Sequence, residues 1–93
     1  MQTVASLEHH QNADAVCTLR VHAPGAGPGG PYDWACTAVI RGNAARLHGA
    51  MQAPSPAQWR AIDAVMRAHG IERVTWERRT ARGVRQVTID LEP

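Results

Sequence analysis

Residues 55–70 (SPAQWRAIDAVMRAHG) constrain the fold most, because they carry both the start and the stop signals of one amphipathic helix. Ser55 suits the N-cap, Pro56 the first helical position and Gln58 the partner position of a capping box. Gly70 suits the left-handed position that follows a helix. Apolar residues recur at helical spacing and form one stripe: Trp59, Ile62, Val65 and Met66. A helix with a single apolar stripe needs another layer of structure to cover it.

The rest of the chain is expected to supply that layer as strands, because apolar and polar residues alternate on both sides of the helix. The alternation predicts four strands before the helix and two after it: residues 3–10, 15–23, 34–41, 44–51, 71–79 and 84–91. Gly42 and Asn43 indicate a tight turn, so we expect a hairpin at 34–51. The loop RTARG between the last two predicted strands indicates a second hairpin at 71–91. The predicted order is β-β-β-β-α-β-β. The fold class is α+β, a two-layer sandwich of a mostly antiparallel sheet with one helix on one face.

The same alternation assigns side chains to the two faces of the sheet. The residues of the 44–51 strand expected to face inward are Ala45, Leu47, Gly49 and Met51. All three tryptophans are expected to face inward as well: Trp34, Trp59 and Trp76. His22 and His48 are expected to share the outward face, where they would approach each other. Little aromatic surface would then remain for stacking on nucleic-acid bases.

A chain of 93 residues is expected to form one domain, residues 1–93. Within it lies a glycine- and proline-rich run, APGAGPGGPYDW, at 23–34. The run leads into a strand, so it lacks the helix N-terminus that a phosphate-binding loop requires. We therefore expect a flexible Gly/Pro loop at 23–33, with Tyr32 near its end as an exposed contact residue.

The sequence predicts a cytoplasmic protein. No apolar run approaches the roughly 20 residues that cross a bilayer. The first residues lack the basic and apolar parts of a signal peptide. In the cytosol Cys17 and Cys36 would be reduced, and both fall on inward faces of predicted strands as small buried thiols.

The residues that usually carry catalysis or bind metals do not cluster in this sequence. The five histidines show no zinc-type spacing, and no two carboxylates stand at a spacing that argues for a catalytic pair. Nothing in the spacing places a histidine beside either cysteine. We therefore expect no enzyme, no catalytic residue, no metal site and no cofactor.

The arginines are the most informative polar residues, since all 10 basic residues of the chain are arginine. Five of them cluster in the last predicted hairpin, with only Glu77 between them to offset the charge: Arg73, Arg78, Arg79, Arg82 and Arg85. Three more are expected on the outward face of the sheet: Arg20, Arg41 and Arg46. That face and the hairpin tip would then be basic. We predict that the five clustered arginines and Tyr32 bind an anionic partner.

Residues 55–91 also resemble small phage and prophage accessory proteins. In these a helix precedes a G-[IF]-x-x-[VL]-x-[WY]-E-R-[RK] segment, an arginine-rich turn and a strand that ends in [IV]-D-[LV]. The matching residues are Gly70, Ile71, Val74, Trp76, Glu77, Arg78, Arg79, Ile89, Asp90 and Leu91. Some such proteins are similar to a cut-down acetyltransferase core, and others act as anti-CRISPR proteins do, by binding to a molecular machine of the host. This chain lacks the Gln/Arg-x-x-Gly-x-Gly/Ala run that holds acetyl-CoA in acetyltransferases.

The sequence and the resemblance together favour a small non-enzymatic binding protein. They imply that a phage or mobile element encodes it, and that it docks on a host protein or nucleoprotein complex in the host cytoplasm. One alternative is a nucleic-acid-binding module that places the same arginines on phosphates. A second alternative is an acyltransferase-like enzyme. An uncovered sheet face or an exposed edge strand could also form a homodimer.

Overall fold

The computed structural model describes residues 2–10, 13–50 and 52–91, and shows six strands and one helix in those ranges. The elements are β1 (Ala5–His10), β2 (Ala13–His22), β3 (Tyr32–Arg41), β4 (Ala44–His48), α1 (Pro56–Ala68), β5 (Arg73–Thr80) and β6 (Gly83–Asp90). This order confirms the predicted β-β-β-β-α-β-β arrangement and the α+β class. Among the described residues, no helix is long and apolar enough to span a bilayer.

The strands form one sheet in chain order, β1-β2-β3-β4-β5-β6. Every neighbouring pair is antiparallel except β4 and β5, which run parallel because α1 carries the chain back between them. Gly42 has a φ of 60° and opens the tight turn between β3 and β4, where a left-handed conformation is needed. Both predicted hairpins are therefore confirmed.

The helix begins and ends where the local sequence signals place it. The Ser55 hydroxyl accepts a hydrogen bond from the Gln58 amide at 3.1 Å, and the Gln58 side-chain oxygen accepts from the Ser55 amide at 2.8 Å. At the other end Gly70 has a φ of 73°, and the Ile71 amide donates to the Met66 carbonyl at 3.0 Å. This is a Schellman ending, in which buried Met66 and Ile71 close the last turn.

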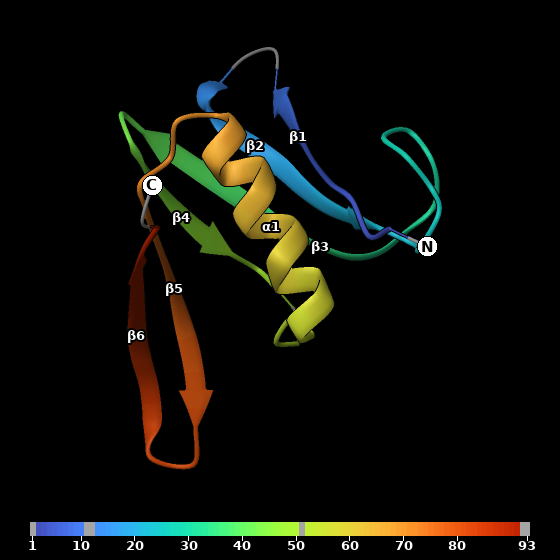
Figure 1. Ribbon diagram of the computed structural model, residues 1–93. Helices are drawn as coiled ribbons and strands as arrows, with labels where there is room; N and C mark the ends of the chain where they lie inside the picture. The colour runs from blue at the N-terminus through green and yellow to red at the C-terminus, as the bar shows by residue number, and fades with distance from the viewer. Residues whose placement is uncertain (1, 11–12, 51, 92–93) are drawn as a thin grey trace.

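The helix lies across one face of the sheet, and the core fills the space between the two layers (Figure 1). Ile62 and Met66 are completely buried on the helix. All but one of the buried strand residues sit at alternate positions, as predicted: Ala5, Cys17, Leu19, Val21, Trp34, Cys36, Ala38, Ala45, Leu47 and Val74. Among the described residues, no helix lies over the opposite face of the sheet (Figure 1).

The β5–β6 hairpin extends beyond the layer that the helix covers (Figure 1). The pairing of β4 with β5 ends at Leu47 and Trp76, whereas β5 continues to Thr80 and turns into β6 at Gly83. Every residue of 77–86 is exposed. We call this segment, residues 77–86, the arm.

The strand predicted at 44–51 is shorter than expected, because β4 ends at His48. Gly49 was expected to face inward, but it is exposed and has a φ of 76°, which breaks the extended conformation. Met51 lies outside the described residues. All three tryptophans face inward, as predicted, but not equally deeply. Trp34 is buried, whereas Trp59 and Trp76 are half-buried and pack against the core where β5 leaves the covered layer.

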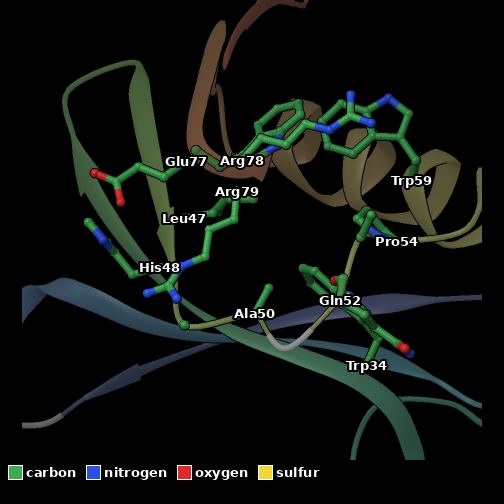
Figure 2. Close-up of a pocket in the computed structure, with 13 residues that line it drawn as sticks. Trp34, Leu47, His48, Ala50, Gln52, Pro54, Trp59, Glu77, Arg78 and Arg79 are labelled. Atoms are coloured by element: carbon green, nitrogen blue, oxygen red, sulfur yellow. Dashed lines mark hydrogen bonds between the residues drawn. The ribbon is translucent and has the colours of Figure 1, made fainter. Parts of the chain in front are cut away.

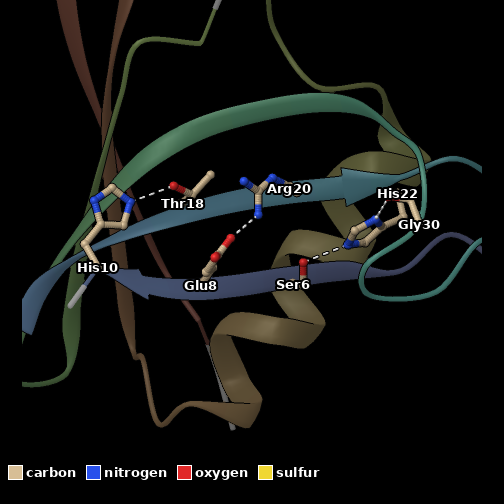
Figure 3. Close-up of polar contacts among 7 residues, drawn as sticks. All are labelled: Ser6, Glu8, His10, Thr18, Arg20, His22 and Gly30. Atoms are coloured by element: carbon tan, nitrogen blue, oxygen red, sulfur yellow. Dashed lines mark hydrogen bonds and ion pairs between the residues drawn. The ribbon is translucent and has the colours of Figure 1, made fainter.

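His22 is buried, with 1% of its surface exposed, which corrects its predicted place on an outward face. The Gly/Pro loop folds back so that the carbonyl of Gly30 accepts from His22 Nδ1 at 3.2 Å, while the Ser6 hydroxyl lies 2.7 Å from Nε2 (Figure 3). His22 pairs with Tyr32, whereas His48 pairs with Thr37 on the other side of β3. The two histidines therefore do not approach each other.

Candidate functional site

A cleft of about 570 Å³ opens where the parallel pairing of β4 with β5 ends. The carboxyl ends of parallel strands are a common place for ligand sites, and the volume lies in the range of ligand pockets. The lining residues come from β3, β4, the 49–54 connection, α1 and β5: Trp34, Leu47, His48, Gly49, Ala50, Gln52, Ala53, Pro54, Trp59, Trp76, Glu77, Arg78 and Arg79.

The cleft forms because the pairing of β4 with β5 ends at Leu47 and Trp76, where only β4 stops. Gly49 turns the chain out of the sheet directly after β4, and residues 49–50 and 52–54 of the connection to the helix line the cleft. β5 instead continues past Trp76 into the arm. The connection and the first turn of α1 form one wall, and β5 forms the other (Figure 2).

Three tryptophan side chains line the cleft. The rings of Trp59 and Trp76 lie 5.3 Å apart between centroids, tilted by 51°, a favourable arrangement for an aromatic pair. Trp34 is buried below them, and its indole N–H donates to the Gln52 carbonyl at 2.9 Å. Because Trp59 and Trp76 are half-buried, part of each ring remains available to a ligand.

The charged side chains of the cleft are mostly basic. Glu77 lies 3.6 Å from Arg46 and points away from the cleft (Figure 2). Arg78 is directed toward the Trp59 side, and Arg79 toward the His48 side (Figure 2). Among the described residues neither arginine has a carboxylate within ion-pair distance. The cleft therefore offers an acidic ligand two uncommitted guanidinium groups.

The structure brings together four of the six predicted partner-binding residues: Arg78, Arg79, Arg82 and Arg85, all on the arm. Arg78 pairs across the hairpin with Arg85, so both point to one face, whereas Arg79 pairs with Val84 and points to the other. Arg82 lies in the turn. The arm is thus basic on both faces and at its tip.

The other two predicted partner-binding residues lie elsewhere. Arg73 is at the start of β5, far from the tip, and its Nε donates to Asp90 at 2.8 Å. That ion pair raises the pKa of Arg73. Tyr32 is exposed at the start of β3, and the Arg20 guanidinium lies 5.3 Å from its ring centroid. Neither residue forms one surface with the arm.

The open face of the sheet is less basic than predicted. Arg20 forms an ion pair with Glu8, and this pair lowers the pKa of the Glu8 carboxyl (Figure 3). Arg46 lies beside Glu77. His10 and Thr18 are hydrogen-bonded at 2.7 Å on the same face (Figure 3). These cross-strand contacts leave only Arg41, of the three arginines expected there, without a carboxylate partner in the described ranges.

A histidine beside a cysteine is a contact that the sequence reasoning missed. Cys17 Sγ lies 3.2 Å from His9 Nδ1, because β1 and β2 pair these two residues directly. Cys17 is fully buried, however, and burial raises the pKa of its thiol, so this geometry does not produce a reactive thiolate. Cys36 is buried too, and its pKa rises to about 12. Both cysteines are free and buried, as predicted.

The start of α1 is poorly suited to bind a phosphate group. Pro56 has no N–H to offer, and the Gln58 amide already donates to Ser55. The Gly/Pro run leads into β3, as its sequence predicted. In the part of the chain that the structure describes, no group of His, Cys, Asp and Glu side chains could hold a metal ion.

No protein-family model, curated protein or solved structure matches this chain. The resemblance of residues 55–91 to phage accessory proteins therefore stays a prediction. The case for a function consequently depends on the cleft and the arm themselves.

Proposed function

We propose that this chain is a small non-enzymatic binding protein that docks its arm on an acidic surface of another protein. In keeping with the resemblance, the partner would be a host protein or nucleoprotein complex, and the chain a phage or mobile-element product that inhibits it. The observation that carries the proposal is the arm itself, which projects from the fold and carries arginines that have no carboxylate partner among the described residues.

Uncommitted arginines on a projecting hairpin favour recognition over stability. Exposed side chains of residues 77–86 bury little apolar surface, so the fold gains little from them. A guanidinium group offers planar, forked donors that match a carboxylate in a bidentate pair. The one acidic residue of the arm, Glu77, is already beside Arg46. Glutamates and aspartates of a partner would supply the missing charge.

The base of the arm holds these arginines in place. β5 and β6 remain paired in register from Arg73 and Asp90 to Thr80 and Gly83, and Trp76 packs on Trp59 at the point where the arm leaves the body. A paired hairpin loses less conformational entropy on binding than a disordered basic tail would lose. This preorganisation supports binding to one defined surface.

The proposal is tested by affinity purification from a nuclease-treated lysate of the host, followed by titration of the purified partner. Reversing two arm charges, Arg82→Glu with Arg85→Glu, is expected to weaken binding at least 100-fold, since each lost charge pair costs about 1.4 kcal/mol or more. The matched control, Arg41→Glu with Arg60→Glu, makes the same change in net charge on two exposed residues elsewhere. Equal affinity of the arm variant and the wild type would refute the proposal.

A second candidate, nucleic-acid binding, is favoured by the distribution of arginines over both faces of the arm. A two-stranded β-ribbon fits the major groove of a DNA duplex, where phosphates line both sides. If four arginines each met one phosphate, the log of the association constant would fall with log salt at a slope of about −3.6. Duplex DNA would then bind about 100-fold more weakly at 200 mM salt than at 50 mM. Absence of DNA binding at the lower salt concentration removes this candidate.

A further inference from the structure

We propose that the cleft between β4 and β5 receives an extended, acidic segment of the partner protein, which pairs with the free edge of β5 as an added strand. This inference rests on the proposed function and names the part of an acidic partner that the cleft would hold. Three features of the cleft support it: an edge of β5 with no described strand beside it, an apolar wall, and two arginines without a carboxylate partner among the described residues.

The free edge follows from the register of the strands. The β5–β6 hairpin closes at Thr80 and Gly83 across a two-residue turn, so these two residues exchange backbone hydrogen bonds. In an antiparallel pair such residues alternate with ones whose backbone groups point to the opposite edge, which here are Glu77 and Arg79. Pairing with β4 ends at Leu47 and Trp76. Beyond that pair, the carbonyl of Glu77 and both backbone groups of Arg79 lie on an edge with no described strand beside it.

The cleft walls then determine which side chains an added strand would carry. Successive side chains of a strand point to opposite faces of the sheet. On the helix side they would meet the half-buried rings of Trp59 and Trp76, which favour apolar residues, with the Arg78 guanidinium at the margin near Trp59 (Figure 2). On the other side they would meet Arg79 and His48, which favour carboxylates (Figure 2). The expected segment therefore alternates apolar and acidic residues.

Charge and length both favour a peptide strand over a small anion. Residues 77–80 span about 13 Å of strand, enough to pair with roughly four residues of a partner. Backbone N–H and C=O groups are obligatory hydrogen-bonding groups, and β-strand addition satisfies them while alternate side chains provide specificity. A small anion would contact the guanidinium groups but leave this edge unpaired.

The test uses a labelled, end-capped peptide of about eight residues that alternates glutamate and leucine, titrated by fluorescence anisotropy against the full chain. Two N-methylated versions remove alternate backbone N–H groups, one set on each edge of the peptide strand. Methylation of one set is expected to raise the Kd at least tenfold, and methylation of the other set to change it less than threefold. Equal effects of the two sets, or no binding of the parent peptide, would overturn the proposal.

Charge is tested separately on both molecules. Replacing the glutamates of the peptide by glutamines, or Arg79→Glu in the protein, is expected to raise the Kd at least tenfold, while Arg41→Glu, far from the cleft, serves as the matched control. The Arg79 amide is expected to exchange with solvent more slowly when the peptide is bound. Unchanged exchange at Arg79 would overturn strand addition. Stronger binding of ATP, a small anion without a strand backbone, than of the peptide at the same site would overturn it too.

The outcomes separate this inference from the proposed function. If the peptides do not bind, while the arm reversal of Arg82 and Arg85 abolishes docking of the purified partner, the proposed function stands and strand addition is wrong. If the peptides bind with the expected dependence on Arg79, while the arm reversal leaves docking unchanged, the cleft is a peptide site and the arm is not the docking surface.

Discussion

Truncating the tryptophan pair at the base of the arm is expected to destabilise the whole fold and to reveal a direct coupling between α1 and β5. Trp59 and Trp76 are each half-buried, and their rings lie 5.3 Å apart. Complete removal of a fully buried aromatic side chain costs about 3–5 kcal/mol, so each half-buried one should cost about 2 kcal/mol. The aromatic contact adds about 0.5–1.5 kcal/mol that either single substitution removes.

Four proteins measure this coupling in a double-mutant cycle: wild type, Trp59→Ala, Trp76→Ala and the double variant. Urea unfolding followed by circular dichroism gives the free energy of unfolding of each. Each single variant loses about 3 kcal/mol in all, burial and aromatic contact together. In thermal unfolding it is expected to lower the melting temperature by about 12–24 °C, at 4–8 °C per kcal/mol for a domain of this size. The double variant should be less destabilised than the sum of the singles, by about 1 kcal/mol. Arg78→Ala, an exposed neighbour, should change stability by about 0.5 kcal/mol or less.

Strict additivity of the two tryptophan substitutions would refute this reasoning. It would mean that Trp59 and Trp76 contribute to stability through separate neighbours, and that α1 does not fix the base of the arm. The preorganisation of the arm would then lack its physical cause. Equal destabilisation by Arg78→Ala would also contradict the account, because it would show that the arm itself carries part of the core.

Three further predictions concern the helix ends and one buried thiol. Ser55→Ala should cost about 1 kcal/mol by urea unfolding, whereas Ser55→Asp, which can cap, should cost less. Gly70→Ala should cost about 1–2 kcal/mol, because Gly70 has a φ of 73°, a left-handed conformation that alanine adopts only with strain. A Cβ there would meet no atom within 4 Å, so the cost comes from the backbone alone. A neutral result would contradict the Schellman ending. Burial raises the pKa of Cys36 from 9.0 to about 12, so the folded chain keeps a proton that the unfolded chain loses. Stability should therefore fall as pH rises above 9, by about 1.4 kcal/mol per pH unit, and Cys36→Ala should flatten that slope.

The sequence predicted the fold well where its signals are local. The capping residues Ser55 and Gln58 and the terminating Gly70 act within one turn of the helix, so the sequence alone indicates where α1 begins and ends. Alternation predicted the strands for the same reason, since each pattern needs only neighbouring residues. The turn at Gly42 likewise depends on one backbone conformation.

The cleft could not be predicted, because it depends on how distant elements meet. The early end of β4 at His48 and the parallel pairing of Leu47 with Trp76 leave one edge of β5 beyond Trp76 without a described strand beside it, and neither follows from the alternation of residues. Alternation predicted that Trp59 and Trp76 face inward, which is confirmed, but it could not indicate that they lie at the margin of the core.

Contacts across strands explain the remaining differences. The pairing of β1 with β2 places His9 beside Cys17 and Glu8 near Arg20, and a register is set by turns and packing over the whole sheet. His22 is buried because the Gly/Pro loop folds back over it, and the composition of that loop gave no indication of where it lies. The arginine cluster was predicted more successfully, since a short hairpin keeps residues close in the sequence close in space.

The affinity of the purified partner for three versions of the chain tests the central claim most directly. The account predicts that Arg82→Glu with Arg85→Glu raises the Kd at least 100-fold without changing the melting temperature. It predicts that Arg41→Glu with Arg60→Glu, which makes the same change in net charge, raises the Kd less than threefold. Equal Kd values for both variant pairs would contradict the claim that the arm is the docking surface.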